Sequence, residues 1–235
     1  MKIAIMQPYV FPYIGYFQLI KEVDKFIFYD DVNFIKKGWI NRNRILSNGT
    51  DFMFTIPLEN VSQFSKIKDI DIDTVNFIVW KNKFLKTIEI NYKKAPYFVE
   101  VFKLISEVMD LNGKYSISDL AIKSVIKVLE YLKIETPLIL STTKYDNNHF
   151  SGQQRILDIC KYEGADHYIN PIGGKELYDS DFFKGDNILI NFIKTKEIKY
   201  NQFKHPFVSG LSVIDVLMFN NKSEINNLLL EFELI

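Results

Sequence analysis

Three segments of the chain combine residue types that bind anions or move protons. The first lies between an apolar stretch, residues 2–6, and a helical pattern, residues 14–23. The start of a helix leaves backbone amides unpaired and carries partial positive charge, so phosphate groups bind there readily. We expect this loop to bind substrate, with Gly15 letting a ligand approach the backbone, and its candidate residues are Gln7, Tyr13, Gly15 and Tyr16. The alternative is that Pro12 and Gly15 only shape a turn and the tyrosines pack.

The second segment, residues 30–44, follows the end of an expected strand, where ligands bind in open α/β sheets. Lysine and arginine side chains can hold a diphosphate, and a carboxylate can take a proton from an amine. We expect this segment to share one anionic pocket with the helix start. Its candidate binding residues are Lys36, Lys37, Arg42, Asn43 and Arg44, and its candidate catalytic residues are Asp30 and Asn41. The alternative is a solvated hairpin edge that is protected by charge.

The third segment, residues 164–179, places a Gly-Gly pair between an expected strand and an expected helix. Backbone amides in such a loop can bind an anion or a substrate. A Gly-Gly pair is also a common turn, so this signal alone is weak. The candidate binding residues are Asn170, Gly173, Gly174 and Tyr178.

The histidines and the cysteine add one further catalytic candidate. His205 precedes a proline in a loop, and histidine titrates near neutral pH, so it could act as a general base. We expect His149 to be an inert surface residue and His167 a satisfied core residue. The spacing of the histidines fits no metal motif, so no metal site is expected. Cys160 lies in an apolar pattern and is expected to be a buried small hydrophobe.

The elements that must position these residues follow from the hydrophobic periodicity. The pattern predicts strands over residues 2–6, 25–29, 39–46, 52–56, 67–72, 138–141, 166–170 and 188–193, and helices over 14–23, 75–92, 97–111, 118–134, 153–163, 211–220 and 223–232. We therefore expect an α/β fold with a mainly parallel sheet and a Rossmann-like N-terminal βαβ unit. Residues 1–235 would form one domain, with a helical subdomain at about 75–135.

Composition limits the classes of protein that fit. The chain has 235 residues, of which 47% are hydrophobic and 15% aromatic, so a packed core is expected. Its 29 basic and 29 acidic residues balance, which argues against a general nucleic-acid binder. No stretch approaches the ~20 apolar residues of a membrane span, and prolines interrupt any signal peptide. We expect a cytoplasmic protein.

Four ordered blocks of the sequence resemble the WbqC-like protein family. They run from Gln7 to Phe17, from Phe28 to Arg44, from Tyr168 to Tyr178 and from Leu211 to Asp215. The resemblance implies an enzyme of bacterial O-antigen, lipopolysaccharide or related surface-glycan biosynthesis that acts on nucleotide-linked amino sugars. Its leading implied reaction is N-acylation or aminoacylation of the sugar amine.

Such a transferase implies its own set of partners and site roles. The co-substrate would be an acyl-CoA or the thioester of an acyl carrier protein, with no tightly bound cofactor. The reaction needs a diphosphate anchor, a base for the amine and donors for the oxyanion. The basic segment would supply the anchor and His205 or Asp30 the base, while the oxyanion donors would be Asn41, Asn43 or the Gly173 and Gly174 amides.

Two other functions remain open from the sequence. The segment Tyr13-Ile14-Gly15-Tyr16 stands where nucleotidylyltransferases carry a His-x-Gly-His signature, which favours a nucleotidyltransferase-like or ATP-dependent activating enzyme. Tyrosine brings no positive charge, however, and this weakens that interpretation. The third alternative is a non-catalytic binding protein of the glycan pathway.

Overall fold

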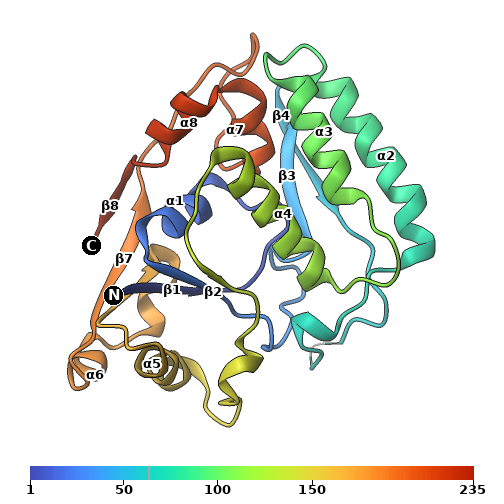
Figure 1. Ribbon diagram of the computed structural model, residues 1–235. Helices are drawn as coiled ribbons and strands as arrows, with labels where there is room; N and C mark the ends of the chain where they lie inside the picture. The colour runs from blue at the N-terminus through green and yellow to red at the C-terminus, as the bar shows by residue number, and fades with distance from the viewer. Residues whose placement is uncertain (63) are drawn as a thin grey trace.

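A six-stranded, mainly parallel sheet forms the centre of the computed structural model, which describes residues 1–62 and 64–235 (Figure 1). The strand order is β5-β2-β1-β6-β7-β8, and only β8 runs antiparallel to its neighbour. The strands are β1 (Lys2–Met6), β2 (Lys25–Phe28), β5 (Leu138–Ile139), β6 (His167–Pro171), β7 (Leu189–Thr195) and β8 (Phe232–Leu234). The predicted α/β class with a mainly parallel sheet is confirmed. The parallel β1-α1-β2 unit and this strand order are compatible with a Rossmann-like arrangement.

Helices cover both faces of the sheet. They are α1 (Ile14–Glu22), α2 (Thr74–Tyr92), α3 (Phe98–Met109), α4 (Ile117–Leu132), α5 (Gly152–Glu163), α6 (Ser180–Lys184), α7 (Val213–Phe219) and α8 (Lys222–Leu228). Successive side chains of a strand point to opposite faces, so Ile3 and Ile5 of β1 pack into the core beneath α5 and α6. Ala4 packs into the core beneath α1, α4, α7 and α8. Both faces are therefore buried, as expected for parallel strands.

A β-hairpin and two long helices lie beside the sheet layer (Figure 1). The hairpin pairs β3 (Arg42–Ser47) with β4 (Thr50–Thr55). Its predicted turn residues, Asn48 and Gly49, both have positive φ, 50° and 78°, as a type I′ turn requires. Helices α2 and α3 pack here, and α4 lies between them and the sheet (Figure 1). The division of the chain into domains stays a prediction.

The structure corrects four predicted elements. Residues 67–72 are a 3-10 turn (Ile67–Asp69) with isolated bridges instead of a strand. The Gly-Gly loop is likewise a 3-10 helix (Ile172–Leu177). The predicted helix at 223–232 ends at Leu228, and the next residues form β8 on the edge of the sheet. Helix α4 begins at Ile117 and not at residue 118, because its cap is Ser116.

The start of α4 is fixed by a capping box. The Ser116 side chain accepts a hydrogen bond from the Asp119 amide, and the Asp119 carboxylate accepts one from the Ser116 amide. These bonds satisfy two donors that a helix start otherwise leaves unpaired. The start of α4 is also tied to the segment after β4, since the Ile117 amide donates to the Ile70 carbonyl. This helix forms one wall of the candidate site.

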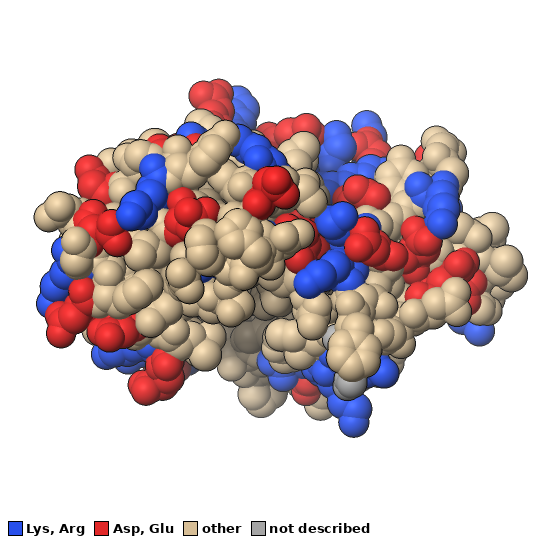
Figure 2. Space-filling model, turned by 90° about the horizontal axis from the view of Figure 1, so that it is seen from below, with Lys and Arg blue, Asp and Glu red and all other residues tan. Residues whose placement is uncertain are grey.

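Charge is mixed over the face of the molecule that Figure 2 shows. Seen from below, positive and negative side chains are interspersed, and the face is hollowed in its lower half (Figure 2). Among residues 1–62 and 64–235, no helix combines the length and apolarity that a bilayer crossing requires.

Candidate functional site

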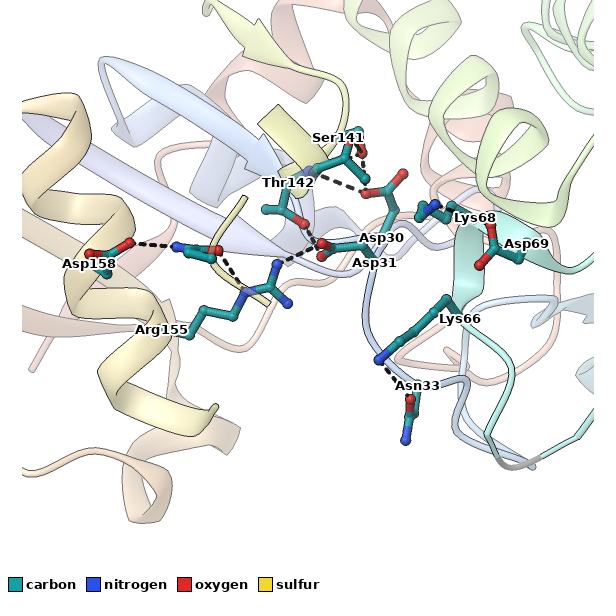
Figure 3. Close-up of polar contacts among 12 residues, drawn as sticks. Asp30, Asp31, Asn33, Lys66, Lys68, Asp69, Ser141, Thr142, Arg155 and Asp158 are labelled. Atoms are coloured by element: carbon teal, nitrogen blue, oxygen red, sulfur yellow. Dashed lines mark hydrogen bonds and ion pairs between the residues drawn. The ribbon is translucent and has the colours of Figure 1, made fainter. Parts of the chain in front are cut away.

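Two adjacent carboxylates follow the carboxyl end of β2 and point to opposite sides (Figure 3). Asp30 faces the start of α4, and Asp31 faces α5. Both are almost fully buried, with 5% and 6% exposure. A buried carboxylate is costly unless it is bonded, so each needs its own partners. The position itself, after a parallel strand, is the one that the sequence predicted.

Asp30 has one constrained oxygen and one that faces a pocket. Its Oδ1 atom accepts hydrogen bonds from the Ser141 hydroxyl at 2.7 Å and from the Thr142 amide at 3.2 Å. Its Oδ2 atom accepts a long hydrogen bond, 3.4 Å, from the Ser118 hydroxyl. Burial raises the pKa of Asp30 above its ordinary value, while the bonds from Ser141 and Thr142 oppose this shift. A carboxylate with a raised pKa is a better proton acceptor than an exposed one.

The pocket beside Asp30 is a groove of about 470 Å³ along α4. One wall consists of α4 residues that share a helix face, and the facing wall comes from the ends of β2 and β5. Two serine hydroxyls of the lining bond Asp30, and the other lining side chains include apolar groups and three lysines. The lining residues are Asp30, Lys68, Tyr115, Ser116, Ser118, Asp119, Ile122, Lys123, Ile126, Lys127, Leu140 and Ser141. The sequence analysis named only Asp30 among them.

Asp31 and Arg155 form a buried ion pair behind Asp30 (Figure 3). Arg155 Nη2 donates to Asp31 Oδ2 at 2.6 Å, and its Nε donates to Asn147 Oδ1 at 2.9 Å. The Thr142 hydroxyl donates to the other oxygen of Asp31. Because the same Thr142 donates its amide to Asp30, the ion pair and the Asp30 carboxylate share one anchor residue. The arrangement holds Asp30 in one orientation.

The third predicted segment packs together at the end of β6. The Tyr168 hydroxyl donates to Asn170 Oδ1 at 3.1 Å and lies 3.0 Å from the Tyr178 hydroxyl. Burial raises the pKa of Tyr178, and Tyr29 from the end of β2 adds to this shift. A side chain at Gly174 would meet the Asn170 amide. The ends of β2 and β6 are thus brought together, while Gly173 is exposed.

The predicted N-terminal loop divides between the interior and the surface. The Tyr16 hydroxyl is buried and donates to the Gln7 carbonyl at 2.9 Å. Gly15 leaves room for Tyr13 and Thr195 side chains, since an added Cβ would meet both. The prediction that Gly15 opens the backbone to a ligand is therefore wrong. Tyr13 is 40% exposed and remains accessible.

Most polar side chains of the basic segment already bond backbone carbonyls. Arg42 donates to the carbonyls of Lys37 and Gly38. The Asn43 amide is buried and donates to the Phe11 carbonyl at 2.6 Å, and the Asn41 amide donates to the carbonyl of Ile56. These two amides are already engaged, which leaves them poorly placed as oxyanion donors. The side chains of Lys36 and Lys37 are exposed.

Part of the expected convergence between these two segments does occur. A pocket of about 250 Å³ is lined by Tyr9, Pro12, Tyr13, Trp39, Asn43, Arg44 and Gly210. Arg44 donates to the Gly210 carbonyl at 3.1 Å, and its guanidinium lies over the Trp39 ring. Asp30 does not line this pocket. The groove along α4 and this aromatic pocket are separate sites.

The histidines and Cys160 lie away from the Asp30 groove. His205 and Gly49 line a third pocket. The imidazole packs so closely on Gly49 that an added Cβ would lie 2.5 Å from the ring. His167 bonds Asn191 at 2.8 Å, and His149 is exposed. Burial raises the pKa of Cys160 to about 12, as for a core residue. Among the described residues, no group of three or more His, Cys, Asp or Glu side chains could hold a metal ion.

The last resemblance block serves the core. Ser212 caps α7, and its hydroxyl oxygen accepts a hydrogen bond from the Ile214 amide. Asp215 is fully buried and accepts hydrogen bonds from Tyr92 at 2.9 Å, Tyr200 at 2.7 Å and Gln202 at 2.6 Å. Three donors satisfy this carboxylate, so it joins α2, α7 and the segment after β7. We interpret it as a structural network.

Asp30→Asn is expected to become more stable relative to the wild type as pH rises. At acid pH the carboxyl is protonated in both states. Between its unfolded pKa, about 3.9, and its raised folded pKa, the unfolded state ionises first, so the wild type loses stability. The variant lacks this loss. Urea unfolding at pH 3.5 and pH 7 should show the advantage of Asn growing with pH, and an advantage that shrinks would contradict the burial argument.

Comparisons with known proteins find a family and an uncharacterized relative, and they assign no reaction. A sequence model of the WbqC-like protein family matches residues 7–227. The uncharacterized protein Rv1507c of Mycobacterium tuberculosis is 28% identical over 226 residues, covering 95% of each chain. No solved structure matches the chain.

Proposed function

The chain belongs to the WbqC-like protein family, and we propose that it is an enzyme that transfers an acyl or aminoacyl group to the amine of a nucleotide-linked amino sugar. The acyl donor would be an acyl-CoA or an acyl carrier protein thioester. The product would serve bacterial surface-glycan biosynthesis. The observation that supports this proposal best is a buried carboxylate, Asp30, whose weakly bonded Oδ2 atom lies beside Ser118 in a groove that hydroxyl groups line.

The reaction uses Asp30 as its general base. The amine nitrogen attacks the carbonyl carbon of the thioester, a C–N bond forms and the C–S bond breaks. Asp30 Oδ2 takes the proton that the nitrogen loses and passes it to the leaving thiolate, which gives an amide and a free thiol. Such proton transfer contributes about 10²–10⁴-fold to a rate. The raised pKa of Asp30 suits this role.

The two oxygens of Asp30 have different roles in this proposal. Ser141 and Thr142 hold Oδ1, so the carboxylate cannot rotate freely and Oδ2 keeps facing the groove. The Ser118 hydroxyl donates to Oδ2 at 3.4 Å, and its oxygen can still accept a hydrogen bond from a sugar hydroxyl. His205, the other predicted base, lines a different pocket, which favours Asp30.

The proposal is tested by the mass of the sugar product. The protein is incubated with a panel of nucleotide-linked amino sugars and acyl thioesters, and the mass of each sugar is measured by mass spectrometry. The expected result is a gain equal to the acyl group, with one free thiol released per product. The same nucleotide sugars without the amine are the control and should stay unchanged. No mass gain across the panel would count against the proposal.

A further inference from the structure

We propose that the lysines at the outer end of the Asp30 groove bind the diphosphate of the nucleotide-linked sugar, so that the substrate lies along α4 with its amine at Asp30. This inference rests on the proposed function for the identity of the amine end. The anion site itself rests on the geometry of α4. The sequence predicted a diphosphate on Lys36, Lys37, Arg42 and Arg44. The two guanidinium groups bond loop carbonyls and Asp51, while the two lysines are exposed.

The groove is elongated because its wall is one face of a helix. Ser118, Ile122 and Ile126 follow each other at four-residue spacing and all line it. Ser118 touches Asp30, whereas Lys127 lies nine residues further along α4. At 1.5 Å per residue this separates the two ends by roughly 13 Å. A sugar ring followed by a diphosphate is an elongated ligand of this kind.

The charges of the groove are separated in the same direction. Asp30 is at the inner end, while Lys123 and Lys127 stand one turn apart on α4. Like charges at this spacing repel each other. Burial lowers the pKa of Lys123 and Lys127 adds to this shift, while Asp110 and Glu107 oppose it. A bound dianion would relieve that repulsion. Lys68, from the 3-10 turn Ile67–Asp69, also lines the groove, and its backbone amide donates to the Asp30 carbonyl at 3.0 Å.

The carboxylates near these lysines leave them free to exchange partners. Lys68 pairs with Asp69 at 3.2 Å and Lys127 with Glu130 at 2.8 Å, and both pairs are exposed. Exposed ion pairs contribute little to stability, so a phosphate can replace them. Asp119, the other carboxylate of the groove, is engaged in the α4 cap. Lys123 donates to the Asp110 carbonyl at 2.7 Å, and the carboxylates of Asp110 and Glu107 lie near it. A bound diphosphate would replace these contacts.

The test is calorimetric titration with inorganic diphosphate at fixed ionic strength. The wild type should bind it, the single variants Lys123→Met and Lys127→Met about tenfold more weakly, and the double variant about 100-fold more weakly, since each loses one charge-assisted contact. Lys103→Met removes an exposed lysine from α3 and should bind like the wild type. Circular dichroism confirms that each variant is folded. Equal binding by the wild type and the double variant, or no binding by the wild type, would overturn the site.

The same variants separate this inference from the proposed reaction. If diphosphate binding falls in the lysine variants while no sugar is acylated, the anion site stands and the reaction does not. If a nucleotide-linked sugar is acylated and the double variant leaves its KM unchanged, the reaction stands and the anion site does not. The expected outcome is a KM raised about 100-fold with kcat retained.

Discussion

Asp30→Asn is expected to lower kcat for amine acylation by about 10²–10⁴-fold, because it removes the proton acceptor. Asparagine keeps the size of the side chain, and its oxygen can still accept the bonds from Ser141 and the Thr142 amide. The loss should therefore fall on kcat while the KM for the sugar changes little. Steady-state kinetics with the substrate found in the mass assay measures this.

The control for this variant is an exposed aspartate elsewhere in the chain. Asp181 lies in the first turn of α6 and pairs with Lys184 on the surface. Asp181→Asn should retain the wild-type kcat. The role of Asp30 as base would be contradicted by a kcat within a factor of three of the wild type. It would also be contradicted by an equal loss in both variants.

Arg155→Gln is expected to destabilise the protein by about 3–5 kcal/mol, because it leaves the buried Asp31 carboxylate without its partner. The two side chains are only 4% and 8% exposed, and their atoms lie 2.6 Å apart. Arg155 also bonds Asn147, so its loss frees a second buried group. Urea unfolding monitored by circular dichroism gives the free energy of unfolding.

Burial, and not distance, should decide the size of this effect. Lys161 lies on the same helix and pairs with Asp186 at the same 2.6 Å, but its side chain is 57% exposed. Lys161→Gln should cost less than about 1 kcal/mol. Adding Asp31→Asn to Arg155→Gln should recover part of the loss, since the unpaired charge is gone. Equal costs for the two single variants would contradict the interpretation of Arg155 as a buried anchor.

The fold could be predicted where local pattern and burial agree. The apolar run at 2–6 predicted β1 because parallel strands are buried on both faces. The helical spacing of apolar residues after it predicted α1. The alternating isoleucines at 67–72 wrongly predicted a strand. Ile67, Ile70 and Ile72 are buried, but they belong to a 3-10 turn after β4 and to the residues that follow it. Strand β8 was missed because its only support is pairing with β7, a contact between distant residues.

The candidate site was harder to predict because its walls come from distant parts of the chain. Asp30 was visible from its place after a strand. Lys123 and Lys127 looked like ordinary surface residues of an amphipathic helix, and nothing local connects them to Asp30. Conversely, Arg42 looked like a ligand-binding residue, and its bonds to nearby carbonyls appear only in the folded hairpin. Charge type alone does not show which groups the fold has already used.

The most direct test of the central claim is a crystal structure of the protein with a nucleotide-linked amino sugar. We expect the amine nitrogen about 3 Å from Asp30 Oδ2, within hydrogen-bond reach, and the diphosphate beside Lys123 and Lys127. A sugar bound instead in the pocket of Tyr13, Trp39 and Arg44, or with its amine turned away from Asp30, would contradict the claim.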